Sequence, residues 1–329
     1  MIDRRQVLAA LSASAIAPLF GGSHAAAASG TLKVATLKFG SLGWLLETIA
    51  AEKLAEKAGV RIERFEVATN QAGPIALLSG EVDVIVSDWT WAMRQRSLGQ
   101  NLRFRPFSGT LGAVMVAKNG PVKTLADLEG KRIGVAGSAI DKTWILLRAY
   151  SRKVLGRDIA ELAQPVFAAA PLVAEELRNG RVDACLNFWT YAARLEGAGF
   201  VPLLSADDIM TKLGIDPAPP LVGFIWREET AQAKPAEFKA FFDAVDAGGN
   251  VLATSDAAFE RLRPLMRAET DAEFFALKAY YRSGIPKPWR QAQTEAAEQL
   301  FNLLVELGEQ DLVGAAKFDA KLFDGHRNP

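Results

Sequence analysis

Two short stretches of this 329-residue chain, each opening Trp-Thr and closing on a second aromatic residue, have side chains suited to stacking on a flat molecule. Aromatic rings provide a large contact area, and each ring pair adds roughly 0.5–1.5 kcal/mol. The alternative is simple packing, because tryptophan is largely buried on average. We expect Trp89 and Trp91 of the first stretch, and Trp189 and Tyr191 of the second, to line a ligand site.

Polar groups lie directly beside both aromatic stretches. Asp88 precedes the first, and Asn187 lies two residues before the second, so either side chain could hydrogen-bond a ligand. Asp88 could equally cap the helix that follows it. Asp83 and Asp183 lie earlier in the same segments, where strands should begin, and we predict a structural role for them.

Two further segments, "KFGSLGW" and "GSAIDKTW", each precede a predicted helix, whose free N–H groups can bind anions. Lys38 and Lys142 could pair there with a carboxylate or sulfonate, or could instead be solvated or salt-bridged. Asp141, beside Lys142, is also a candidate for ligand contact, and its charge argues against a site built for anions alone. The other candidates for ligand contact are Ser41, Trp44, Asn70, Gln71, Ser108, Thr110 and Ser138.

The histidine and cysteine content excludes several kinds of site. The two histidines, His24 and His326, lie near the ends of the chain, and the single cysteine, Cys185, lies in an apolar segment. Ser-His-Asp, Cys-His and histidine-based zinc sites therefore lack their central residue. We expect no catalytic residue, no metal and no cofactor. The net charge is zero, which gives no electrostatic case for binding nucleic acid or an anionic membrane.

The segments that carry these residues are two copies of one unit. "GEVDVIVSDWTWAMR", from Gly80, and "GRVDACLNFWTYAAR", from Gly180, match in register at Gly, Val, Asp, Trp, Thr, Ala and Arg. The same offset aligns Trp44 with Trp144. Around both copies, strand and helix patterns follow in the order β-α-β-α-β, which favours an α/β fold with a parallel sheet.

The remaining segments predict how the two units are joined. "GAVMVAK" and "PAPPLVGFIWREE" indicate strands that cross between the units, and residues 233–321 have a mainly helical pattern. We predict a bilobed protein, with residues 29–115 and 223–329 in lobe 1 and residues 116–222 in lobe 2. Ligands bind beyond the carboxyl ends of parallel strands, so two facing sheets form one cleft that can close by a hinge motion.

The N-terminus has the pattern of an export signal. Arg4 and Arg5 precede an apolar stretch, and small residues follow with a predicted cleavage site near Ala27 or Ala28. Residues 1–28 are thus a twin-arginine-like signal, although an ordinary secretory signal that happens to carry two arginines would look similar. We expect a periplasmic protein without stable membrane insertion.

Three stretches, "LLSGEVDVIVSD", "GAVMVAKNGPVKTLADLEGKRIGV" and "ELRNGRVDACLNF", resemble those of periplasmic substrate-binding proteins of ABC importers. The resemblance is to the nitrate/sulfonate/taurine and thiamine-precursor (NMT1-like) group, and it covers nearly the whole mature chain. It implies a type II periplasmic-binding fold, with two parallel-rich sheets and a two-segment hinge. It also implies a monomeric receptor that delivers a small molecule to a permease and its ATPase.

The tryptophans indicate what kind of molecule that is. Six of the seven lie in or near the predicted cleft segments, and only Trp289 lies in the helical part. We therefore expect a small organic ligand that is planar, aromatic or acidic. One alternative is a periplasmic sensor or accessory protein that hands its ligand to a partner. A remote alternative is an NMT1-like enzyme using carboxylate or lysine chemistry.

Overall fold

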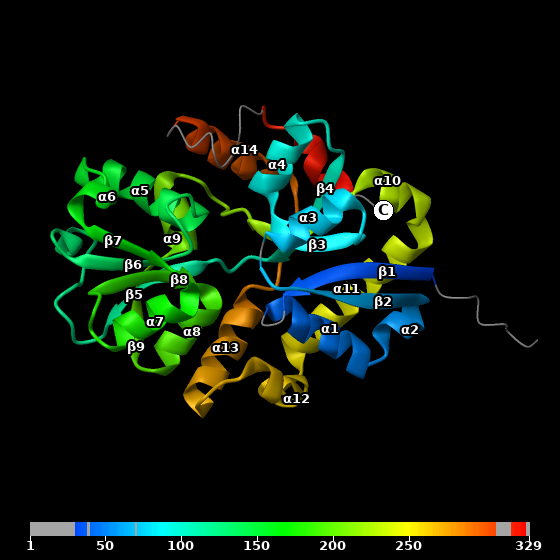
Figure 1. Ribbon diagram of the computed structural model, residues 1–329, viewed down its shortest axis with the longest axis horizontal. Coiled ribbons are helices and arrows are strands. Elements are labelled where there is room, and N and C mark those ends of the chain that lie inside the picture. Colours follow the sequence, from blue (N-terminus) through cyan, green and yellow to red (C-terminus); the bar gives the residue numbers. More distant parts are fainter. Residues whose placement is uncertain (1–29, 38–39, 70, 307–316, 327–329) are drawn as a thin grey trace, which may run out of the picture.

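The computed structural model describes residues 30–37, 40–69, 71–306 and 317–326, which form two α/β lobes (Figure 1). Each lobe is built on a five-stranded sheet, with strand order β2-β1-β3-β10-β4 in the first and β7-β6-β8-β5-β9 in the second. The strands are β1 (Gly30–Leu37), β2 (Val60–Val67), β3 (Val84–Asp88), β4 (Leu102–Ser108), β5 (Gly112–Ala117), β6 (Arg132–Ala136), β7 (Gln164–Ala168), β8 (Ala184–Phe188), β9 (Phe200–Ser205) and β10 (Val222–Arg227).

Helices cover the faces of both sheets (Figure 1). They are α1 (Ser41–Ala51), α2 (Leu54–Ala58), α3 (Ala72–Ser79), α4 (Trp89–Ser97), α5 (Lys142–Leu155), α6 (Ile159–Leu162), α7 (Ala170–Arg178), α8 (Trp189–Gly197), α9 (Ala206–Leu213), α10 (Glu228–Ala233), α11 (Pro235–Thr254), α12 (Asp256–Met266), α13 (Asp271–Ser283) and α14 (Gln291–Glu306), with 3₁₀ turns η1 (Ala126–Leu128) and η2 (Ala320–His326). No helix in these described segments is long and apolar enough to cross a membrane.

Strand direction shows that the two lobes repeat one plan. β1 runs parallel to β2 and β3, and β6 runs parallel to β7 and β8. β10 is antiparallel to its neighbours β3 and β4, just as β5 is antiparallel to β8 and β9. Each sheet therefore receives one antiparallel strand as the chain crosses from the other lobe. The bilobed α/β fold predicted from the sequence is confirmed.

The repeated aspartates serve the fold, as predicted. In the first lobe, the backbone N–H of Lys33 donates to the Asp83 carboxylate at 2.8 Å. In the second, the backbone N–H of Arg132 donates to Asp183 at 2.9 Å. Both aspartates thus join the chain just before the third strand of their unit to the first strand.

One predicted helix is divided in two. The apolar spacing across 45–58 predicts a continuous helix, but α1 ends at Ala51 and α2 begins at Leu54. Between them, Lys53 adopts the left-handed conformation with φ of 53°, which interrupts the helical hydrogen bonds. Gly59 ends α2 with φ of 87°, the left-handed conformation in which glycine commonly ends a helix.

The helix α13 connects the C-terminal part of the chain to the second lobe. It packs along α8 and lies between the two lobes in Figure 1. Its Glu273 side chain is 4% exposed and pairs with Arg178 at 2.9 Å and Arg194 at 3.4 Å, both from the second unit. The Tyr280 hydroxyl adds a hydrogen bond to Glu196 at 2.7 Å.

Candidate ligand-binding cleft

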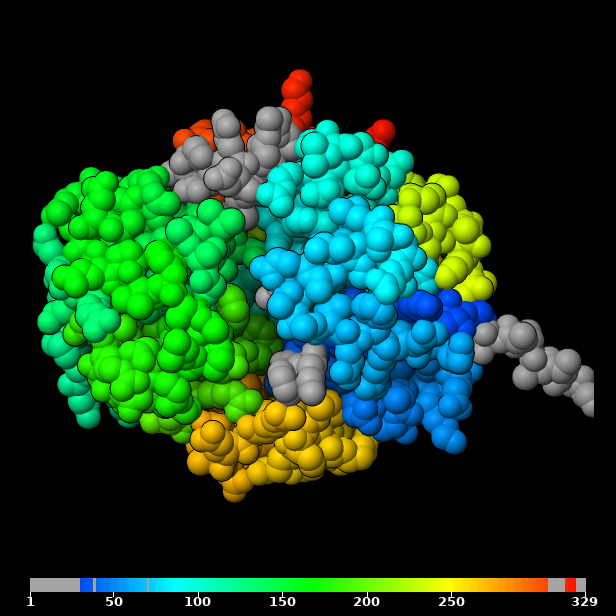
Figure 2. Space-filling model, viewed as in Figure 1, coloured from blue at the N-terminus to red at the C-terminus, as the bar shows by residue number. Residues whose placement is uncertain are grey.

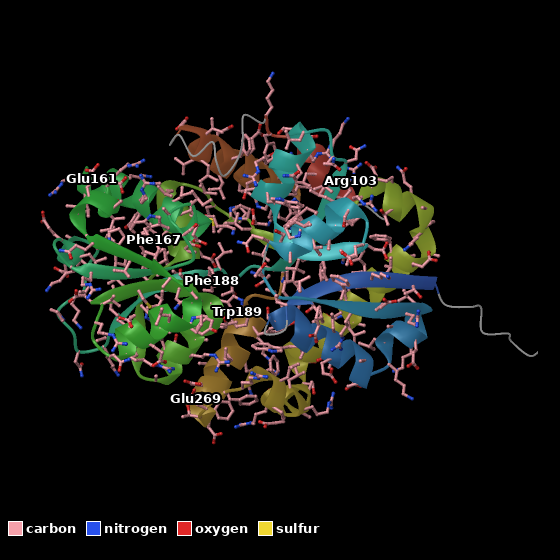
Figure 3. The ribbon with its side chains drawn as sticks, viewed as in Figure 1. Arg103, Glu161, Phe167, Phe188, Trp189 and Glu269 are labelled. Carbon is pink, nitrogen blue, oxygen red and sulfur yellow. The ribbon has the colours of Figure 1, made fainter. Side chains whose placement is uncertain are left out.

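The carboxyl ends of β3 and β8 bring the two repeated aromatic stretches to the region between the lobes. Figure 2 shows that the molecule is hollowed where the lobes meet. Phe188 and Trp189 lie at the edge of the second lobe that faces the first (Figure 3). Loops at such strand ends are where open α/β sheets bind ligands. A ligand site is therefore expected in the predicted cleft between the lobes.

An ion pair joins the lobes in this region. Lys142, the first residue of α5, lies 3.4 Å from the Asp88 carboxylate at the end of β3. Their side chains are 22% and 19% exposed. Asp88 also caps α4, because its other oxygen accepts hydrogen bonds from the Trp91 backbone N–H at 2.9 Å and from the Thr90 hydroxyl. Asp88 is thus a helix cap, one of the two roles that its position allowed, and its carboxylate also pairs with Lys142 across the lobes.

Both members of this pair are held in their charged forms. Burial opposes ionisation of Asp88, but the charge of Lys142 and hydrogen bonds from Thr90 and Trp91 keep its pKa below the ordinary value. Burial also opposes the charge on Lys142, yet the nearby carboxylates of Asp88 and Asp141 raise the pKa of Lys142. A simple anion entering here would meet a lysine that is already neutralised.

Aromatic rings form a second contact between the lobes. The rings of Trp44 on α1 and Trp189 on α8 meet edge to face, with centroids 5.8 Å apart. Tyr281 of α13 contacts both, with its centroid 5.8 Å from Trp44 and 6.4 Å from Trp189. These three rings come from distant parts of the sequence.

Trp89 and Trp189, which were expected to line one ligand site, lie in different apolar clusters. Trp89 has no exposed surface and packs against Phe323 of η2, at 5.8 Å between centroids. Its indole N–H is buried without a hydrogen-bond partner among the described residues. Trp91 and Tyr191 are half-buried. Trp91 packs against an apolar cluster that contains residues of both lobes, and Tyr191 packs against a cluster of the second lobe. Trp89 is thus part of the core and is not open to a ligand.

Two of the polar candidates have structural hydrogen bonds. The buried Asn187 side chain donates to the Ala170 carbonyl at 2.9 Å and accepts from the Phe188 backbone N–H at 2.9 Å. Asp141 caps α5 by accepting from the backbone N–H groups of Thr143 and Trp144. Asn187 is 2% exposed and is bonded at both of its amide atoms, so it is not open to a ligand in this arrangement.

Three predicted residues, Ser41, Ser108 and Trp189, meet at a groove of about 890 Å³. This volume lies within the range of small-molecule sites. The groove extends from these residues between β4, β10 and α11, and residues 284–289 line it as well. Sequence reasoning missed its other walls, which include Arg105, Phe107, Phe224, Phe242, Asp246, Gly249, Tyr281, Lys287 and Trp289.

The remaining candidates lie apart from this groove. Gln71 and Ser138 are exposed, at the start of α3 and in the loop before α5. Thr110 lines a separate pocket of about 160 Å³ and donates to the Tyr280 carbonyl at 3.3 Å. Lys38 and Asn70 lie outside the described residues.

The lobes, their crossing strands and the cleft define the class of bilobed binding-protein folds. Solved structures that share this fold include the alkanesulfonate-binding protein SsuA from Xanthomonas axonopodis pv. citri, with 17% identity, 85% of this chain and 93% of that chain covered, and a TM-score of 0.64. Periplasmic SsuA from Escherichia coli has 19% identity, 84% and 87% coverage, and a TM-score of 0.65. At such identities the likeness shows the fold alone.

Part of the sequence also matches a known protein family. Residues 105–256 match the family described as NMT1/THI5 like. This match bears out, over these residues, the resemblance to the NMT1-like group that was stated from the sequence. No curated protein matches the sequence. The desulfurization enzyme DszB also shares the fold, with 16% identity, 89% and 95% coverage and a TM-score of 0.61, so the fold alone does not separate receptors from enzymes.

Proposed function

We propose that this protein is an exported solute receptor, which captures a small organic molecule between its lobes and delivers it to an ABC permease. The observation that carries the proposal is the contact between the lobes at their strand-end loops. Asp88 meets Lys142 there, and Trp44 meets Trp189. A ligand held among such groups contacts both lobes at once, and its binding energy then favours the closed arrangement.

The ligand that suits this site is planar or aromatic and carries an acidic group. Trp189 and Tyr281 supply rings to the groove, and Ser41 and Ser108 supply hydroxyl groups. The Xanthomonas SsuA is described as bound to MOPS, which supports a small organic ligand in this fold. Export through residues 1–28 fits the periplasmic location given for the Escherichia coli protein.

A binding role is also favoured over thiol chemistry. Cys185 is the only cysteine, and it has no exposed surface. Burial raises the pKa of its thiol to about 12, although Asn187 acts in the opposite direction through a hydrogen bond. A thiol with that pKa is almost entirely protonated at neutral pH and is a poor nucleophile.

Solution scattering with a panel of candidate solutes tests the proposal. A true ligand should reduce the radius of gyration of the purified mature protein and change its tryptophan fluorescence, and it should be recovered unchanged. Lys142→Gln is a useful comparison, because it removes one contact between the lobes and leaves the groove intact. Compaction by no solute in a broad aromatic and acidic panel, or chemical conversion of the bound solute, would contradict a receptor function.

A further inference from the structure

The groove has two well-fixed aromatic walls. One wall is backed by Phe242 of α11, the long helix that covers the first sheet, and Arg105 lies over the Phe242 ring. On the other side, Trp289 stacks on Phe323 at 4.8 Å, with 13° between the ring planes, and its indole N–H donates to Thr294 at 2.9 Å. The chain that leads to Trp289 is also held, because the Gly109 backbone N–H donates to the Gly284 carbonyl at 2.8 Å. Walls held in this way can receive a rigid ring without reorganising.

The groove is lined by more positively charged than negatively charged side chains. Arg105 pairs with Asp246 at 2.8 Å and lies over the Phe242 ring at 4.6 Å. Lys239 pairs with Asp243 at 2.7 Å. Lys287 also lines the groove, and it has no ion pair within the described part of the chain. One positive charge is therefore in excess, on an exposed side chain at the groove.

We propose that this groove is the site for the rings of a planar aromatic acid, with the acidic group directed toward Lys287. The proposal rests on the receptor function proposed above and deepens it, because it places most of the ligand against the first lobe and α11. Only one end, at Trp189, then contacts the second lobe. The partly exposed rings of Phe107, Tyr281 and Trp289 at the groove favour such a ligand over a bare oxyanion, which needs many donors and few rings.

Gly249 provides a way to close the groove without disturbing the fold. It lines the groove within α11, and a Cβ atom built on it meets no other atom within 4 Å. Replacing a glycine inside a helix also favours helix formation, by up to about 1 kcal/mol for alanine. Gly249→Phe should therefore fill the groove, and Gly249→Ala is the matched control that leaves it open.

The probe is 2-naphthoate, a planar bicyclic acid, with 2-naphthalenemethanol as its uncharged counterpart. We expect Gly249→Phe to weaken naphthoate binding by at least about tenfold, while Gly249→Ala stays close to the wild type. Lys287→Glu should weaken naphthoate binding by about fivefold and leave the alcohol unaffected, because an exposed charge pair contributes only modestly. Lys57→Glu, at an exposed lysine on α2, is the control for net charge.

Calorimetric titration measures each affinity, and circular dichroism checks that every variant is folded. Equal naphthoate affinity in the wild type and Gly249→Phe would overturn the groove as the site, as would a wild type that does not bind naphthoate at millimolar concentration. Solution scattering, which measures ligand-induced compaction, tests the receptor function separately from the groove. Binding that Gly249→Phe abolishes, without ligand-induced compaction of the wild type, would support the groove and count against the receptor.

Discussion

The loop that leaves β3 and the loop that leaves β8 make the same main-chain contact and use their side chains differently. The Trp89 backbone N–H donates to the Leu221 carbonyl at 3.1 Å, and the Trp189 backbone N–H donates to the Leu111 carbonyl at 3.0 Å. In each lobe the acceptor lies just before the strand that crosses over from the other lobe. The two indole rings, however, point to different partners. The equivalent main-chain contacts therefore preserve the fold of both units, whereas the side chains at the same positions contact different residues.

The helices that follow these loops differ in the same way. In the first unit α4 packs near η2, whereas in the second unit α8 packs closely along α13. That close approach depends on Gly197, where a Cβ atom would lie 2.6 Å from the backbone of Glu273. The equivalent residue of the first unit is Ser97, which is exposed. The second copy is thus shaped for the close approach of the helix α13.

The largest expected effect is on the core tryptophan. Trp89→Ala should lower the free energy of unfolding by about 3–5 kcal/mol, because a fully buried tryptophan side chain is lost from the core. It should leave the affinity of the folded protein for its ligand unchanged. Trp189→Ala should be less destabilising and should weaken ligand binding. Urea unfolding measures the stability of both variants, and ligand titration measures their affinity. Equal losses of affinity would contradict the assignment of Trp89 to the core and Trp189 to the ligand site.

A smaller effect is expected from exchanging the helix-end residues of the two copies. Gly197→Ser should destabilise the protein by about 2 kcal/mol, because the new side chain forces α8 away from α13. The reverse change, Ser97→Gly, should cost no more than about 1 kcal/mol, since it affects only an exposed helix end. Thermal unfolding of the two variants measures the difference. Similar losses would show that the close packing of α13 on α8 does not matter for stability.

The order of the elements could be predicted from the sequence because it depends on local patterns. Strand and helix periodicity, together with the fixed offset of the repeat, placed both parallel units and both crossing strands. The structural role of Asp83 and Asp183 followed from their repeated position at the start of a strand. Each of these features involves residues that are close in the chain or aligned by the repeat.

The site could be predicted only in part, because its partners are distant in the chain. Trp89 and Trp189 occupy equivalent positions of the repeat, and what separates them is contact with Phe323 in one case and Tyr281 in the other. No local pattern predicts such contacts. Trp289 was assigned to the helical part for the same reason, although it lines the groove.

The smallest expected effect concerns the ion pair that the first copy makes and the second copy lacks, since the residue equivalent to Asp88 is Phe188. The pKa of Asp88 is lowered from 3.8, so its contribution to stability is complete above pH 3.8 and is lost as the pH falls through the lowered value. The pKa of Lys142 is raised from 10.5, so its contribution is complete below pH 10.5 and is lost as the pH rises through the raised value. The pair should therefore be intact throughout the neutral range.

Asp88→Asn removes the charge while an amide oxygen remains to cap α4. It should lower stability by about 1 kcal/mol near pH 7, because both side chains are only partly exposed. The deficit should shrink as the pH falls below 3.8, where the wild type loses the same charge. A double-mutant cycle with Lys142→Gln isolates the interaction, since each single change also alters other contacts. A coupling energy of zero at neutral pH would mean that Asp88 acts only as a cap, and that the two copies differ at the cleft through their aromatic rings alone.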